Sequence, residues 1–153
     1  MVRLATTLLL FCGIAQAAVP THFGDKMEAA LLCRDEWSTA FWQGYFREHF
    51  KEPLRIWGEA EWFGVEGAEL AGSPVLEVFV NLPDSTALMV GAYLNAPIDK
   101  VKQAVEQKRG TQFKAIAQGR FISSAGSVLV PVPDGEEGKT KWYCARWNLG
   151  NRP

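Results

Sequence analysis

The N-terminal segment of this chain has the composition of a secretory signal peptide, which does not take part in the final fold. Arg3 gives a positive start, residues 4–14 are apolar, and Ala15-Gln16-Ala17 matches the small-residue pattern cleaved by a signal peptidase. We expect cleavage to leave residues 18–153, beginning at Ala18, as the protein that folds. The mature protein is then expected in the periplasm or outside the cell.

The same segment has two other interpretations, a membrane anchor and a lipid attached to Cys12. The apolar run does not continue past Ala18, and Pro20 would interrupt a longer helix, which argues against an anchor. Lipid attachment needs a small residue before the modified cysteine, whereas Phe11 is bulky. We therefore expect no transmembrane anchor in the mature chain.

Cleavage leaves two of the three cysteines, Cys33 and Cys144, in an oxidising environment. A disulfide between them is the natural prediction, and the loop it closes is valued at about 4 to 5 kcal/mol by the chain-entropy model. The alternatives are two buried thiols or an intermolecular bridge. Neither cysteine belongs to a C-x-x-C pair, so a structural bond is expected rather than a redox-active one.

Length and charge favour one ordinary globular domain. Removing 17 of the 153 residues leaves 136, which is close to the commonest domain size. The formal net charge is −1 for the whole chain, and no basic cluster stands out. Binding to nucleic acid is therefore not expected, because it requires a concentrated positive surface.

The spacing of apolar residues predicts a single α+β domain over residues 18–153. Helices are expected from Asp25 to Arg34, from Asp35 to Pro53, and from Asn95 to Gly110. Strands are expected over residues 54–65, 75–82, 87–94, 113–123, 127–132 and 140–147. The predicted fold is an N-terminal helical pair and one later helix, packed on an antiparallel sheet of about five or six strands.

The last predicted strand also indicates how the disulfide is placed. Period-two alternation puts Trp142, Cys144 and Arg146 on one face, and Tyr143 and Ala145 on the other. If Cys144 points inward to meet Cys33, the end of the first helix is attached to the final strand.

No catalytic, metal or cofactor motif can be defended from this sequence. The chain has two histidines, His22 and His49, and no further ligands can be placed beside them, so no metal and no cofactor are predicted. There is no G-x-S-x-G nucleophile motif. Paired acids, Glu59 and Glu61, leave a small hydrolase as a weaker alternative, because glycosidases use two carboxylates beside aromatic walls.

The remaining signal is aromatic surface combined with charge. Trp57, Glu59, Glu61 and Phe63 alternate along the strand predicted at 54–65, which would place them on one face as a recognition surface. In the competing interpretation, Trp57 and Phe63 pack under the first helices as core.

Function is predicted by elimination as much as by pattern. We expect a small exported non-enzymatic binding protein of inhibitor or immunity type, which acts through a protein–protein surface on a partner in the cell envelope or outside the cell. The alternative is an exported pocket protein that binds an apolar or sugar ligand, because aromatic side chains line concave sites.

Overall fold

The computed structural model describes residues 19–35, 38–132 and 138–147. The predicted signal peptide (residues 1–17) and the predicted new N-terminus, Ala18, lie outside the described residues, as does Trp37. Within the described ranges, no helix has the length and apolar character needed to cross a membrane.

Three helices form close to where the sequence predicts them: α1 (Phe23–Leu31), α2 (Thr39–Phe50) and α3 (Ile98–Arg109). Helix α2 begins later than expected because Ser38 is its cap, and the Ser38 side chain accepts a hydrogen bond from the Phe41 N–H. Helix α3 ends where expected, at Gly110, which adopts a left-handed conformation with φ of 65°.

The strands form one antiparallel sheet in the order β1-β2-β4-β5-β9-β8-β7-β6, with β3 paired to β4. Their bounds are β1 (Arg55–Trp57), β2 (Ala60–Gly64), β3 (Glu69–Leu70), β4 (Ser73–Asn81), β5 (Ala87–Leu94), β6 (Phe113–Ala115), β7 (Phe121–Ser123), β8 (Ser127–Pro131) and β9 (Thr140–Trp147). The α+β class is confirmed. The predicted five or six strands are too few, since the sheet has nine described strands.

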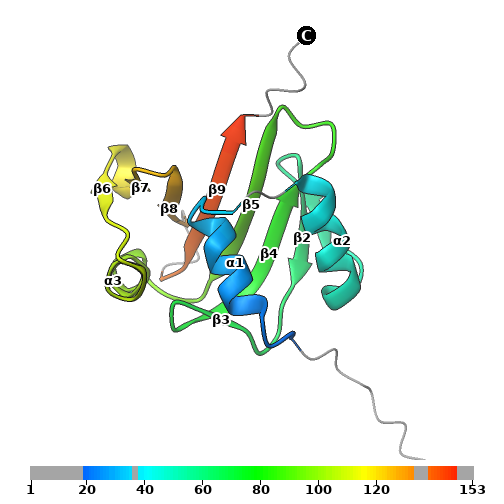
Figure 1. Cartoon of the computed structure of the whole chain (residues 1–153), viewed down its shortest axis with the longest axis horizontal. Helices are drawn as coiled ribbons and strands as arrows, with labels where there is room; N and C mark the ends of the chain where they lie inside the picture. Colours follow the sequence, from blue (N-terminus) through cyan, green and yellow to red (C-terminus); the bar gives the residue numbers. More distant parts are fainter. Residues whose placement is uncertain (1–18, 36–37, 133–137, 148–153) are drawn as a thin grey trace, which may run out of the picture.

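Two of the extra strands arise because two predicted strands are each a hairpin, and the third is β3, which lies in a segment predicted as a turn and pairs with the start of β4. Residues 54–65 reverse direction at Gly58 and Glu59, which both have φ of 59° and join β1 to β2 in a two-residue turn. Residues 113–123 reverse between β6 and β7, where Gln118 and Gly119 have positive φ. Figure 1 shows β6 and β7 beside α3, at the far end of the sheet from α2.

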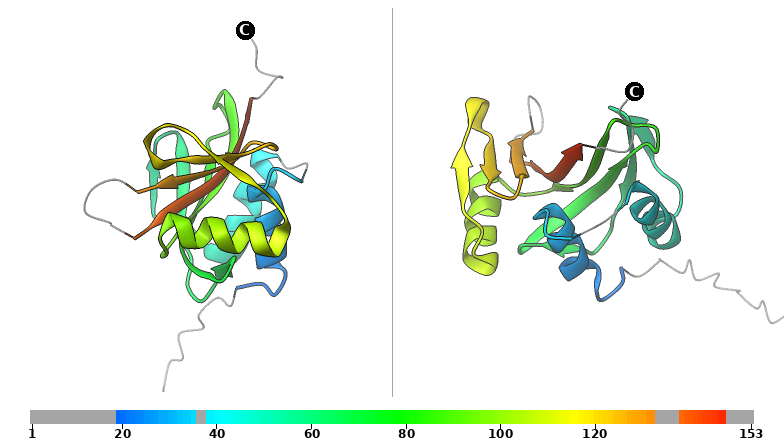
Figure 2. Two further views of the ribbon diagram at one scale, coloured as in Figure 1. Left: turned by 90° about the vertical axis from the view of Figure 1, so that its left-hand side faces the viewer. Right: turned by 45° about the horizontal axis from the view of Figure 1, so that its top comes forward.

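All three helices contribute to one hydrophobic core against one face of the sheet. Helices α1 and α2 lie side by side on the same side of the central strands, and α3 lies beside β6 and β7 (Figures 1 and 2). The largest fully buried side chains of this core are Trp42, Trp142, Phe23, Phe46, Phe63 and Met27.

The predicted disulfide is confirmed: Cys33 is bonded to Cys144, and their Cα atoms are 5.4 Å apart. Cys33 lies just after the end of α1 and has φ of 58°, in a capping motif where the N–H groups of Cys33 and Arg34 donate to the carbonyls of Ala30 and Ala29. Cys144 is fully buried on β9, so its face is the inner one, as the alternation predicts. Arg146 donates to the Cys33 carbonyl and reinforces the junction.

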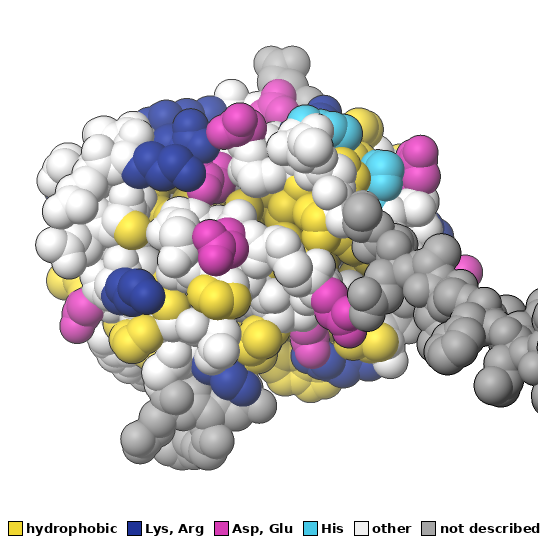
Figure 3. Space-filling model, turned by 90° about the horizontal axis from the view of Figure 1, so that it is seen from below, with side chains coloured by type: hydrophobic (Ala, Val, Ile, Leu, Met, Phe, Trp, Pro, Cys, Tyr) yellow, Lys and Arg dark blue, Asp and Glu magenta, His cyan; other side chains and the backbone are white. Residues whose placement is uncertain are grey.

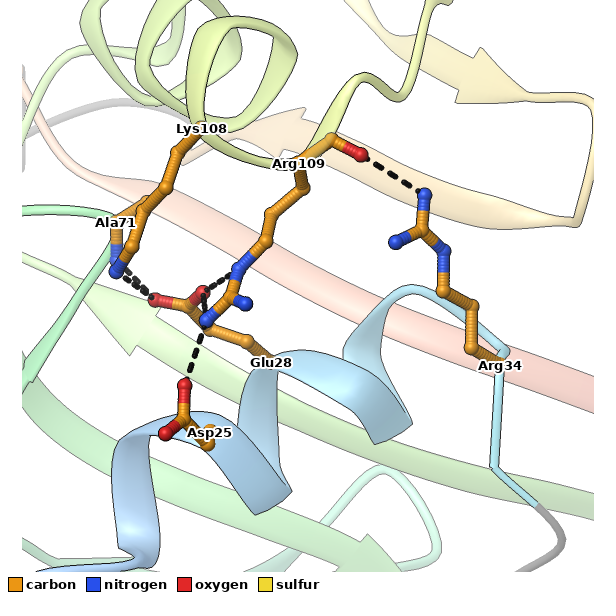
Figure 4. Close-up of polar contacts among 6 residues, drawn as sticks. All are labelled: Asp25, Glu28, Arg34, Ala71, Lys108 and Arg109. Atoms are coloured by element: carbon orange, nitrogen blue, oxygen red, sulfur yellow. Dashed lines mark hydrogen bonds and ion pairs between the residues drawn. The ribbon is translucent and has the colours of Figure 1, made fainter.

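A buried carboxylate joins α1, the β3–β4 turn and the end of α3 (Figure 4). Glu28 is 2% exposed and accepts hydrogen bonds from the Ala71 N–H at 2.7 Å, from Lys108 at 3.2 Å and from Arg109 Nε at 2.5 Å. Asp25 accepts a further bond from Arg109 at 2.8 Å. Because both oxygens of Glu28 are engaged, this cluster is a structural joint between three segments.

Candidate functional site

The four residues predicted to share one surface do not do so. The turn at Gly58 and Glu59 reverses the chain, so Trp57 pairs with Ala60 and faces away from the helices, while Phe63 faces them and is fully buried. Trp57 is 59% exposed. The prediction of a single recognition face is therefore wrong. The core interpretation is right for Phe63 and wrong for Trp57.

The two acids of that segment are also separated. Glu61 is buried on the helix side and forms an ion pair with Arg47 of α2. Glu59 lies exposed in the turn, where its carboxylate accepts a bond from the Ser85 hydroxyl at 3.3 Å. The structure thus does not bring Glu59 and Glu61 together as an acid and base pair.

The sheet face opposite the helices carries a second cluster of aromatic side chains, which we call the aromatic face. Trp62 and Phe79 stack with ring centroids 4.3 Å apart, and Tyr93 and half-buried Tyr143 lie in the same cluster. Trp57 extends the cluster toward the sheet edge, and the centroids of the Trp57 and Trp62 rings are 5.7 Å apart. The Trp62 Nε1–H donates to the Trp57 carbonyl at 2.9 Å, which orients the inner indole. None of the described helices packs over this cluster.

Gly91 of β5 is required for this arrangement because Phe79 lies directly over it. The two residues are cross-strand partners, and a Cβ on residue 91 would lie 2.0 Å from the Phe79 ring. Phe79 can therefore lie low against the sheet, where Trp62 stacks on it.

We expect Gly91→Ala to lower the free energy of unfolding by about 1–3 kcal/mol, because the displaced Phe79 ring must break its stack with Trp62. Urea denaturation followed by tryptophan fluorescence measures both effects. Gly44→Ala is the matched control: a Cβ there meets nothing within 4 Å, so alanine should stabilise α2 by about 0.5–1 kcal/mol. Unchanged stability and fluorescence in Gly91→Ala would contradict the role given to the glycine.

Cationic side chains border the rings of the aromatic face. The Arg55 guanidinium lies 4.8 Å from the Trp62 ring centroid and binds the Glu77 carboxylate through two bonds of 2.7 and 2.6 Å. The Lys141 ammonium lies 4.6 Å from the Trp57 centroid and 5.3 Å from that of Trp62. Such contacts fix the position of an exposed indole.

Two adjoining hollows open on the aromatic face, and both are lined by Trp57, Trp62 and Lys141. The first, of about 340 Å³, is completed by Gly58, Ala60, Phe79, Met89, Arg120, Val130 and Tyr143. The second, of about 370 Å³, is completed by Arg55, Glu77, Tyr93 and Val132. The first hollow has a largely apolar wall and three polar side chains, those of Arg120, Lys141 and Tyr143.

Tyr143 lines the first hollow and is a half-buried phenol. Burial raises the pKa of Tyr143 above its ordinary value, and the charge of nearby Arg120 lowers it by a smaller amount. Like an ordinary tyrosine, it is protonated at neutral pH, so its hydroxyl group is a hydrogen-bond donor for a group placed in the first hollow.

The histidines lie away from this face. His22 Nε2 is 3.3 Å from the Tyr45 hydroxyl, and the His22 and His49 rings are 6.4 Å apart. Figure 3 shows these two side chains in cyan beside an apolar area. Among the described residues, no group of three or more metal-ligating side chains comes together.

Sequence reasoning missed Phe79, Arg120, Lys141 and Tyr143 as site residues. A signal for two of them was present, because alternation along β9 sets Lys141 and Tyr143 opposite Cys144, and a buried disulfide leaves them on the outer face. Phe79 and Arg120 had no such signal, since their position depends on strand pairing and on the β6–β7 hairpin.

Comparison with protein-family models, with curated proteins and with solved structures gives no match for this chain.

Proposed function

We propose that this is an exported, non-enzymatic binding protein that holds a partner protein on its aromatic face, in the manner of an inhibitor or immunity protein. The observation that carries the proposal is Trp57, a 59% exposed indole that contacts the Lys141 ammonium and the Trp62 ring and lines a largely apolar hollow. An exposed tryptophan fixed in one orientation loses little side-chain entropy on binding.

The residue types around Trp57 support a protein partner. Aromatic residues, methionine and arginine are enriched at the centres of protein interfaces, whereas lysine and acidic residues are depleted there. The first hollow is lined by Met89, Phe79, Tyr143 and Arg120, by one lysine, Lys141, and by no acidic side chain. A partner side chain that enters this hollow would be enclosed by rings, which is the environment of an interface hot spot.

Export is supported by the predicted signal peptide and by the Cys33–Cys144 bond, since disulfides persist in oxidising compartments. The partner is therefore sought in the cell envelope or outside the cell.

Replacing Trp57 by alanine should weaken partner binding at least about 30-fold, equivalent to about 2 kcal/mol, because the truncation removes the anchor. The thermal stability of the Trp57→Ala variant should stay nearly unchanged, since most of the Trp57 ring is exposed. The measurement is capture from the native envelope fraction by wild-type and Trp57→Ala baits, with captured proteins quantified by mass spectrometry.

Two controls separate binding from folding. Phe41 is an aromatic residue of α2, 43% exposed, and Phe41→Ala should capture the same proteins as the wild type. Trp62 is 3% exposed, so Trp62→Ala should cost about 3–5 kcal/mol of stability. Capture that is equal for the Trp57→Ala and wild-type baits would overturn the proposal.

A second candidate function is binding of a sugar that carries an acidic group. It is favoured by the open shape of the two hollows, their indole walls and the Arg120 guanidinium at the rim. Titration with acidic and neutral oligosaccharides, followed by tryptophan fluorescence, tests it: saturable quenching by the acidic series alone, lost in Arg120→Gln, is the expected result.

A further inference from the structure

Strand β1 ends the sheet and carries large apolar side chains in solvent. One side of β1 pairs with β2, and no other strand of the described chain pairs with its free side. Ile56 and Trp57 of β1 are 63% and 59% exposed, and Leu54, which directly precedes the strand, is 65% exposed; they are three of the five exposed large hydrophobic residues in the described ranges. An unprotected apolar edge is a template for pairing with another strand.

The opposite edge strand of the sheet, β6, does not expose large apolar side chains. Edge strand β6 buries Phe113 and exposes Lys114 and Ala115, and a lysine on an edge strand discourages pairing between chains. The exposed apolar residue nearest that edge is Ile116, which is 44% exposed. The comparison marks β1, and not β6, as the edge suited to a partner strand.

We propose that β1 pairs with β1 of a second copy of this chain, antiparallel and centred on Ile56, so that two sheets join into one. A two-fold axis at Ile56 sets the two Ile56 side chains opposite each other. It also sets Arg55 of each copy opposite Trp57 of the other, because directly opposed residues in an antiparallel pair share a face.

The chain already contains the contact that this arrangement repeats. Within one copy, Arg55 and Trp62 are cross-strand partners of β1 and β2, and the guanidinium lies 4.8 Å from the indole centroid. An antiparallel β1 pair forms the same arginine–tryptophan contact twice. A parallel pair in register would instead place Arg55 beside Arg55 of the second copy, which costs electrostatic energy.

The Ile56 contact of the dimer lies on the helix side of the sheet, whereas its Arg55–Trp57 contacts lie on the aromatic face, beside the proposed partner site. Ile56 lies opposite Glu61 on the helix side of the sheet, whereas the hollows open on the aromatic face. Substitutions of Ile56 therefore test pairing of β1 without altering the lining of either hollow.

Cysteine crosslinking tests the register directly. Opposed Cα atoms in an antiparallel pair are about 4.5–5.5 Å apart, which is within the range that a disulfide spans. With oxidised glutathione as the oxidant, Ile56→Cys should convert mainly to a covalent dimer, and Ile116→Cys should stay largely monomeric. Failure of Ile56→Cys to crosslink, or equal crosslinking of both variants, would overturn the proposal.

Analytical ultracentrifugation of the unmodified chain over a range of protein concentrations tests whether it forms a dimer. Because β1 is short, we expect monomer at about 1 μM and dimer at about 1 mM. Ile56→Lys should raise the dimer dissociation constant at least tenfold, and Ile116→Lys should leave it unchanged. A single monomer mass over the whole range, or an intact Ile56→Lys dimer, excludes pairing through β1. Ile56→Lys should still capture the same envelope proteins as the wild type, because Ile56 lines neither hollow. Loss of the dimer and loss of partner binding are therefore separate outcomes.

Discussion

Replacing Cys33 and Cys144 together by alanine should lower the free energy of unfolding by about 2–5 kcal/mol. The bond joins residues 111 apart in sequence, so its loss frees a long loop in the unfolded chain. It also releases the end of α1 from β9. Urea denaturation of the variant and of the reduced wild-type protein measures the effect, and both should lose a similar amount.

A glycine variant separates the bond from the backbone conformation at residue 33. Cys33 has φ of 58°, a left-handed conformation that glycine adopts without strain. Cys33→Gly with Cys144→Ala should therefore be more stable than the double alanine variant by about 0.5–1 kcal/mol. A double alanine variant as stable as the wild type would show that the bond does not contribute to stability.

Replacing Glu28 by alanine should cost about 3–5 kcal/mol, because it removes one partner of a buried ion pair and leaves the other groups unsatisfied. Arg109 would lose its contact with Glu28 at 2.5 Å, and the buried Ala71 N–H would lose its acceptor at 2.7 Å. Three segments are joined at this carboxylate, so α3 should loosen from α1. Thermal melts and amide hydrogen exchange of α3 measure both effects.

Asp25 offers the matched control, since it binds the same Arg109 from the surface. Its side chain is 87% exposed, against 2% for Glu28. Arg109 lowers the pKa of Asp25, chiefly through the hydrogen bond between them, but solvent screens an exposed pair. Asp25→Asn should leave stability nearly unchanged. Equal losses in the two variants would mean that burial does not decide the strength of these contacts.

The parts of the fold that were predictable depend on local patterns. Helix α3 follows from apolar residues at helical spacing and ends at Gly110, where the sequence predicts its end. The Cys33–Cys144 bond follows from counting the cysteines that remain after the predicted signal-peptide cleavage, and the inward face of β9 follows from that bond. Each of these predictions uses only residues that are close in sequence or an argument by exclusion, and none requires knowing which strands pair.

The candidate site was harder to predict because a single turn, at Gly58 and Glu59, reverses the chain within it. Residues 54–65 have the composition of one strand, and Gly58-Glu59 is a weak turn signal compared with the Asn-Gly or Asp-Gly that such hairpins favour. Once the chain reverses there, Trp57 and Phe63 move to opposite faces. The four residues predicted as one surface are then divided between the core, the turn and the aromatic face.

The sequence by itself determined the α+β class, the three helices and the disulfide, because helical periodicity, caps and cysteine pairing are encoded locally or by elimination. Only the tertiary structure decided which aromatic rings are buried and which are open to solvent. Trp62 and Trp57 are five residues apart and equally apolar, yet one is 3% exposed and the other 59%. The difference comes from strand order: Trp62 lies on an inner strand and stacks on Phe79, while Trp57 lies on the edge strand.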